Sequence, residues 1–114
     1  MKNPYEHLKI DRLDDVLPVE IQQSCVVAGG TTETITIYTS QLSDGSWVYG
    51  YMVYWASGRV SSRKPTAMLG RFRSAKDAQL YAIGFMQSYA TYFQASTRGE
   101  LSSAEAELLQ PQLF

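Results

Sequence analysis

The middle of the chain concentrates basic side chains. Residues 45–76 contain no acidic residue and six basic ones, namely Arg59, Arg63, Lys64, Arg71, Arg73 and Lys76. Residues 1–44 hold three basic against seven acidic residues, and residues 77–114 hold one against four, so the net charge of −1 conceals a basic window. Such a window attracts phosphates or an acidic protein. Alternatively, folding brings the acidic ends beside the basic middle and neutralises it.

The residue types that most often support catalysis or metal binding are scarce. His7 is the single histidine and has no nucleophile close to it in the sequence. Cys25 is the single cysteine and lies midway along an apolar run, where we expect a small buried side chain. One histidine and one cysteine do not supply a zinc site, and no glycine-rich phosphate-binding loop is present. We therefore expect a protein that is not an enzyme and that has no metal and no cofactor.

Length and composition indicate one folded domain. The chain has 114 residues, of which 45% are hydrophobic and 18% charged, as expected of a protein with a hydrophobic core. No apolar run is long enough to span a bilayer, and the N-terminal residues lack the apolar region of a signal peptide. We therefore expect a cytoplasmic protein without a membrane partner.

The order of the helix and strand patterns predicts an α+β fold, with a four-stranded antiparallel sheet in a single domain spanning residues 1–114. Pro4 is typical of a helix start and Pro18 of a helix end. Pro65 interrupts the fourth strand, so we expect this strand at an edge or beside a bulge. Ser74 is expected to cap a long helix that packs on one sheet face. The expected segments are an N-terminal helix (1–18), the sheet (19–73, with strands at 20–28, 33–42, 46–56 and from residue 59), the long helix (74–97), and a short helix and tail (100–114).

Two apolar residues fall on the polar side of the long predicted helix. At 100° per residue, Leu80 and Ile83 lie opposite the apolar arc, where a monomer would gain nothing by exposing them. A second subunit or a protein partner would cover them, which makes them candidate partner-binding residues and a homodimer possible. We favour the other interpretation, in which the C-terminal tail folds back over them with Leu101, Leu108, Leu109, Leu113 and Phe114.

The type of each turn determines which strand residues share a sheet face. We favour a three-residue loop at Ser43–Gly45, which places Ile35 and Ile37 with Tyr51, Val53 and Trp55 under the long helix. A two-residue loop would instead place them with Met52 and Tyr54. At Ser57-Gly58 we expect a two-residue loop, which pairs Tyr54 with Ser61 and places Arg59 and Arg63 on the face of Tyr54.

The sheet face left uncovered by the long helix is expected to combine aromatic and basic side chains. Aromatic rings stack on unpaired bases, and guanidinium groups bind phosphates. Alternatively, the N-terminal helix lies across this face and buries it. The nucleic-acid-binding residues predicted on the first interpretation are Tyr38, Tyr54, Arg59, Arg63, Lys64, Arg71 and Arg73.

The passage from the last strand into the long helix resembles known DNA-binding domains. Residues 67–82 read AMLGRFRSAKDAQLYA, which is similar to the Leu-Gly-x-Phe-x-Thr/Ser turn and alanine-rich helix of the plant ethylene-response-factor domain and of integrase arm-binding domains. The resemblance implies a sheet backed by a helix. These families contact duplex DNA through arginines of their first strands, whereas residues 46–56 contain none. The order of four strands and a helix is similar to that of Whirly-type single-stranded DNA-binding proteins. The matched residues are Leu69, Gly70, Phe72, Ser74, Ala75, Ala78 and Ala82, together with Trp47 as a strand tryptophan.

Two functions are therefore compatible with the sequence. The first is binding of single-stranded DNA or RNA by the basic and aromatic sheet face. The second is a protein-interaction or regulatory module, which would use the surface at Leu80 and Ile83 or the sheet edge near Pro65.

Overall fold

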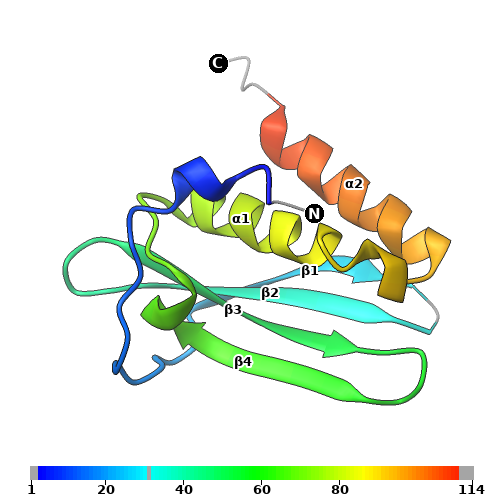
Figure 1. Cartoon of the computed structure of the whole chain (residues 1–114), viewed down its shortest axis with the longest axis horizontal. Helices are drawn as coiled ribbons and strands as arrows, with labels where there is room; N and C mark the ends of the chain where they lie inside the picture. Colours follow the sequence, from blue (N-terminus) through cyan, green and yellow to red (C-terminus); the bar gives the residue numbers. More distant parts are fainter. Residues whose placement is uncertain (1–2, 31, 111–114) are drawn as a thin grey trace.

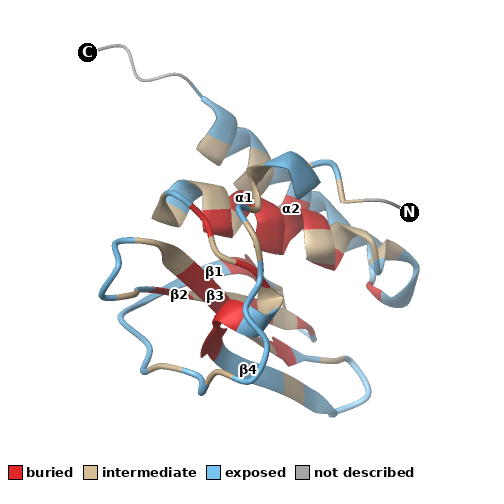
Figure 2. Ribbon diagram, turned by 60° about the vertical axis from the view of Figure 1, so that its left-hand side comes forward, coloured by how far each residue is buried: buried red, intermediate tan, exposed pale blue. Residues whose placement is uncertain are grey.

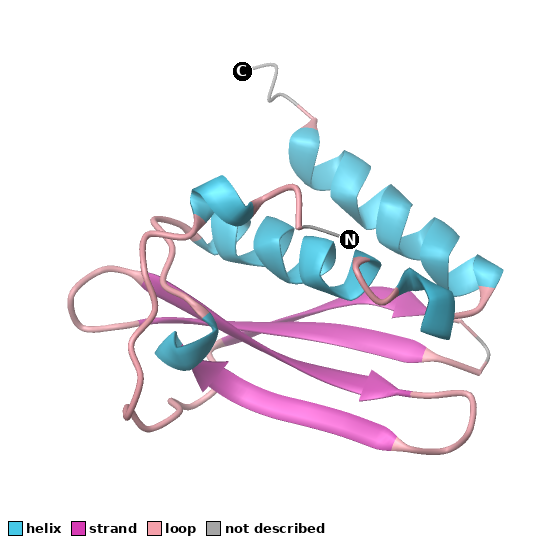
Figure 3. Ribbon diagram, in the orientation of Figure 1, coloured by secondary structure: helices cyan, strands magenta, loops and turns pink. Residues whose placement is uncertain are grey.

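Four antiparallel strands form one sheet in the order β1–β2–β3–β4, and two helices lie on one side of it (Figures 1 and 3). The computed structural model describes residues 3–30 and 32–110. It confirms the α+β fold with a four-stranded antiparallel sheet. The elements are β1 (Gln23–Gly29), β2 (Thr34–Gln41), β3 (Trp47–Tyr54), β4 (Val60–Thr66), α1 (Ala75–Gln87) and α2 (Ala95–Leu109).

The turn between β2 and β3 has the three-residue form that the sequence favours. The N–H of Leu42 donates to the carbonyl of Ser46 at 2.8 Å, and Gly45 adopts a φ of 89°. As a result, Ile35 lies opposite Val53, and Ile37 lies opposite Tyr51. These residues point toward the helices, on what we call the inner face of the sheet. Ile35, Ile37 and Val53 are part of the buried core, and Tyr51 packs against it while partly exposed.

The turn between β3 and β4 has the same three-residue form, so the predicted two-residue loop was wrong. The N–H of Trp55 donates to the carbonyl of Arg59 at 2.9 Å, and Gly58 takes a φ of 92° at the third loop position. Tyr54 therefore faces Val60 instead of Ser61. This shift of one residue moves Arg63, opposite Tyr51, to the inner face.

Within the part of the chain that the structure describes, no helix covers the opposite, outer face of the sheet (Figure 1). Residues Glu6–Leu8 form a single 3₁₀ turn, η1, that packs against α1. The predicted helix over residues 1–18 is therefore wrong for the described residues, and so is the alternative in which it buries the outer face. The outer face carries Ser24, Val26, Thr34, Thr36, Tyr38, Met52, Tyr54, Val60 and Ser62.

The segment that follows η1 is extended because its backbone forms hydrogen bonds with Arg71, which is far away in the sequence. The N–H of Ile10 donates to the carbonyl of Arg71 at 2.8 Å, and the N–H of Arg71 donates to Asp11 at 2.8 Å. Residues 13–22, here named the crossing segment, then pass under one end of the outer face (Figure 1). The N–H of Val19 donates to the carbonyl of Pro65 at 2.9 Å in this segment.

The predicted long helix is interrupted. Ser74 caps α1 as expected, since its Oγ accepts from the N–H of Asp77 at 3.0 Å, but α1 ends at Gln87. A 3₁₀ turn, η3 (Ala90–Tyr92), separates it from α2, which continues through Gly99. The predicted bounds 74–97 and 100–114 were therefore wrong, although two C-terminal helices exist.

Leu80 and Ile83 are buried, with 4% and 0% of their surface exposed. Both α2 and η1 pack against α1. They cover the side of α1 that would be exposed to solvent if the helix lay alone on the sheet. The favoured interpretation, that the C-terminal part of the chain folds back, is confirmed for α2, which contributes the buried Leu101 and the partly buried Leu108, whereas Leu109 is 52% exposed and does not take part. Leu80 and Ile83 form no exposed patch for a partner. Leu113 and Phe114 lie outside the described residues.

Candidate nucleic-acid interface

The inner side of β4 is left open by the two helices. α1 packs on β2 and β3, and α2 packs on β1, whereas β4 has no helix of comparable contact above it. Most of β4 is exposed (Figure 2). Side chains on the inner face of this edge strand therefore border a groove between the sheet and the end of α1.

Aromatic side chains line this groove, which we name the aromatic groove. It consists of two adjoining cavities of about 160 and 510 Å³, and both are lined by Trp55 and Tyr89. Tyr89 is 44% exposed and Tyr92 is 72% exposed, so these rings are available to a ligand. The rings of the aromatic groove are Tyr51, Trp55, Phe85, Tyr89, Tyr92 and Phe93.

Packing holds the central ring in place. The Trp55 indole lies on the buried Phe93 ring, with centroids 4.7 Å apart and planes 6° from parallel. Its Nε1 donates to the Ser61 hydroxyl at 3.0 Å. The indole is thus fixed on one side by η3 and on the other by β4, and a ligand would meet a preformed surface.

The remaining rings follow one another from the sheet toward η3. The Tyr51 and Phe85 centroids are 6.0 Å apart, those of Phe85 and Tyr89 5.2 Å, and those of Tyr89 and Tyr92 6.3 Å. These spacings are typical of tilted and edge-to-face aromatic pairs. The succession begins at the half-buried Tyr51 and ends at two exposed rings, Tyr89 and Tyr92.

Two arginines border the aromatic groove. Arg59 lines the larger cavity, and Arg63 faces Tyr51 across the β3–β4 ladder. Both side chains are exposed. Within residues 3–30 and 32–110, no acidic group forms an ion pair with either of them. Their charge is therefore available to an anionic ligand.

Glu33 is an acidic residue that lines the larger cavity, and it already has structural partners. It is 2% exposed. Its Oε1 accepts from the N–H of Gln94 at 2.9 Å and from the Thr97 hydroxyl at 2.6 Å. A carboxylate at this place complements the positive end of the α2 dipole and satisfies groups at the first turn of the helix.

Three predicted site residues lie on the other side of the sheet. Tyr38 and Tyr54 point from the outer face, with Tyr54 49% exposed. Lys64 lies beside the crossing segment and forms an ion pair with Glu20 at 3.2 Å. The predicted face that joins Tyr38 and Tyr54 to Arg59 and Arg63 is therefore wrong, because the second turn is longer by one residue.

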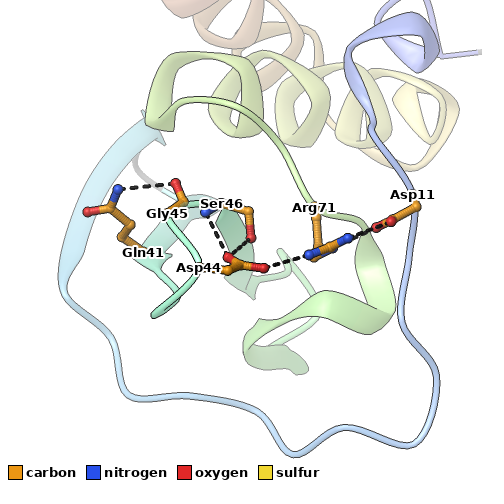
Figure 4. A network of polar contacts seen from close by, with 6 residues as sticks. All are labelled: Asp11, Gln41, Asp44, Gly45, Ser46 and Arg71. Carbon is orange, nitrogen blue, oxygen red and sulfur yellow. Dashed lines mark hydrogen bonds and ion pairs between the residues drawn. The ribbon is translucent and has the colours of Figure 1, made fainter.

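Arg71 is occupied by two carboxylates at the opposite end of the sheet (Figure 4). Its Nε and Nη2 donate to Asp11 at 2.6 and 2.5 Å, and its Nη1 donates to Asp44 at 2.6 Å. Hydrogen bonds from Arg71 lower the pKa of Asp11, and hydrogen bonds from Ser46 lower that of Asp44. Acidic residues thus neutralise Arg71 and Lys64 but not Arg59 and Arg63. Arg73 is exposed near this end.

The candidate catalytic residues lie apart from the aromatic groove. His7 is exposed in η1. Cys25 is exposed on β1, so the expectation of a buried cysteine was wrong. Among the described residues, no group of three or more histidine, cysteine, aspartate and glutamate side chains could hold a metal ion. None of the helices in the described ranges is both long and apolar enough to cross a bilayer.

The chain matches none of the protein-family models, curated proteins or solved structures with which it was compared. The resemblance of residues 67–82 to DNA-binding domains therefore stays a prediction.

Sequence reasoning missed most of the aromatic groove. Phe85, Tyr89, Tyr92 and Phe93 fall within the continuous long helix predicted over residues 74–97, and Trp55 was placed on the strand face beneath that helix. The spacing of these rings gave no signal, because residues 85, 89, 92 and 93 would all fall on one face of a continuous helix. Gly58 was a usable signal for the second turn, because Gly45 marks the same third position in the first turn.

Proposed function

We propose that this protein binds single-stranded DNA or RNA in the aromatic groove and is not an enzyme. One observation carries the proposal: two arginines without an ion pair among the described residues lie on the groove side of the sheet. Arg59 lines the cavity that holds the exposed Tyr89 and Tyr92, and Arg63 lies opposite the half-buried Tyr51. Guanidinium groups at the border of the groove would contact phosphates, and the rings inside it would stack on bases.

The combination favours a single strand over a duplex. Bases in a duplex are stacked on one another, so rings such as Tyr89 and Tyr92 would find no free base surface. In a single strand, each base stacked on an aromatic ring contributes about 1–3 kcal/mol, largely without regard to sequence. Arg63 lies four positions after Arg59, so their Cα atoms are roughly 13 Å apart along the strand. The two guanidinium groups would therefore contact different phosphates of one short oligonucleotide.

A fluorescence titration tests the proposal. A labelled oligonucleotide short enough to fill one groove, and the matching duplex, are titrated at about 50 and 200 mM salt. We expect micromolar binding that prefers the single strand and weakens with salt. Arg59→Ala/Arg63→Ala should reduce the salt slope by about 0.7 for each lost phosphate contact. Tyr92→Ala should weaken binding by about tenfold, the loss of one stacked base.

The chain offers matched controls outside the groove. Arg73→Ala removes an exposed arginine at the other end of the sheet, and Tyr54→Ala removes an exposed tyrosine from the outer face. Both should bind like the wild type. If the control variants lose as much affinity as the groove variants, the aromatic groove is not the binding site. If the wild type does not bind at the lower salt concentration, nucleic-acid binding is contradicted altogether.

The position of β4 supports a second candidate function, binding of an extended peptide. β4 is an edge strand, and the hydrogen bond of the crossing segment to this strand is at Pro65, which leaves the edge from Val60 to Lys64 without a neighbouring strand among the described residues. A peptide pairing with this edge would place alternate side chains against the aromatic groove. Selection from a displayed peptide library tests this, and enriched peptides should lose binding to the Trp55→Ala variant.

A further inference from the structure

The outer face of the sheet exposes apolar side chains from three strands. Val26 of β1 is 61% exposed, Tyr54 of β3 49% and Val60 of β4 51%. Met52 and Tyr38 are half-buried, Met52 in the same row across the strands as Val26, and Tyr38 opposite Gly50 in the adjacent row. The register places all five on the outer face, and both helices lie on the other side of the sheet (Figure 1). Thr34 and Thr36 of β2 lie among them, so the face combines apolar and hydroxyl side chains, and several exposed apolar groups on one face are typical of an interaction site.

The charge on this face is nearly absent. All nine outer-face residues are uncharged. Lys64 lies at the margin and is paired with Glu20 of the crossing segment. A nucleic acid would find no free cation here, and an acidic or basic protein would find no complementary charge.

We propose that the outer face binds the outer face of a second copy of this chain in a two-fold symmetric dimer. Around a two-fold axis, each side chain lies near its own copy, so a charged residue would meet a like charge. The outer face consists of uncharged β-branched, aromatic and hydroxyl side chains, so two copies can meet there without repulsion between like charges. This proposal does not depend on the proposed function, because the aromatic groove is on the other side of the sheet and stays open in such a dimer.

The crossing segment determines how two copies can meet. It occupies one end of the outer face, near Ser40 and Pro65, so only the other end can accept a second sheet. The two free ends would overlap, with the paired residues Thr36 and Met52 near the axis. At common strand spacings the free region measures roughly 20 by 20 Å, so a dimer would bury about 800 Å² in total, an area typical of weak and transient interfaces. We therefore expect a weak dimer, with a dissociation constant on the order of 100 µM.

Sedimentation equilibrium from about 5 to 500 µM protein tests the proposal, since this range brackets the expected dissociation constant. The mass should rise from 12.8 kDa toward twice that value. Tyr54→Lys and Val26→Lys should each weaken the dimer at least tenfold, because each places like charges across the axis. The matched control Tyr92→Lys alters a residue 72% exposed on the groove side and should dimerise like the wild type. Circular dichroism and Tm verify that each variant is folded.

Crosslinking supplies an independent measurement. Thr36→Cys in a Cys25→Ser background should be joined to a second copy by a bismaleimide of about 10 Å, the distance between packed sheets. Arg73→Cys in the same background should not be joined. A wild-type chain that stays at 12.8 kDa at every concentration would overturn the proposal. So would a dimer that tolerates both outer-face lysines and is lost in Tyr92→Lys.

Discussion

Phe93 lies flat against Trp55, with ring centroids 4.7 Å apart and planes 6° from parallel. Phe93 directly follows η3, in the connection between α1 and α2. Trp55 directly follows β3, at the start of the β3–β4 turn. The pair therefore joins the break between α1 and α2 to the β3–β4 turn. Both residues also line the smaller cavity of the aromatic groove, together with Tyr51, Phe85 and Tyr89.

Removing this pair should destabilise the whole fold. Phe93 is 4% exposed, so Phe93→Ala should lower the free energy of unfolding by about 3–4 kcal/mol through lost burial and a new cavity. Urea denaturation measures the loss. Tyr92→Ala removes the neighbouring exposed ring and should change stability by less than about 1 kcal/mol. Equal losses for the two variants would show that Phe93 is not a core residue.

Glu33 should control the start of α2. Its Oε1 accepts two hydrogen bonds, from the Gln94 N–H and the Thr97 hydroxyl, and Glu33→Ala leaves both donors without this acceptor. We expect a loss of about 1–3 kcal/mol and faster hydrogen exchange in the first turn of α2. Glu33→Gln keeps a carbonyl oxygen at the same place and should lose less. Unchanged exchange in Glu33→Ala would contradict the capping role.

Two glycines should respond in opposite directions to the same substitution. A Cβ at Gly50 would lie 2.3 Å from the Arg63 carbonyl oxygen and 2.6 Å from the Pro65 nitrogen, so Gly50→Ala must displace β4. We expect a loss of about 3 kcal/mol or more. Gly99 lies within α2 with no heavy atom within 4 Å of such a Cβ, so Gly99→Ala should gain about 0.5–1 kcal/mol. Thermal and urea unfolding measure both changes.

Acid should weaken the contact between Asp11 of the N-terminal segment and Arg71, which lies between β4 and α1. Arg71 lowers the pKa of Asp11 below the usual aspartate value, so the ionised carboxylate favours the folded state. This contribution is fully present above about pH 4 and is lost as the pH falls through the lowered folded pKa. Asp11→Asn should therefore lower Tm at neutral pH and flatten its acid dependence. Asp14→Asn, at an exposed position nearby, should retain the wild-type profile.

Local patterns were sufficient for much of the fold. The alternation of Ile35 and Ile37, together with Gly45, predicted the register of β2 and β3, because side-chain period and turn residues act over a few positions. Ser74 predicted the start of α1 for the same reason. Pro65 predicted an edge strand, and β4 is one. The arginines and aromatic rings of the candidate site could also be read from the sequence, although not their arrangement.

Contacts between distant residues decided the rest. Pairing of Asp11 with Arg71 keeps the N-terminal segment extended where its own pattern favours a helix, and the Glu33 carboxylate begins α2 where a continuous helix was expected. The composition of the candidate site depended on the length of one loop. The β3–β4 turn has three loop residues (56–58) instead of two, and this places Arg63 on the inner face of the sheet instead of the outer face. With the three-residue loop, Ser61 comes to the inner face, where its hydroxyl accepts from the Trp55 Nε1 at 3.0 Å. This contact forms only in the folded sheet, so the turn residues by themselves do not reveal it.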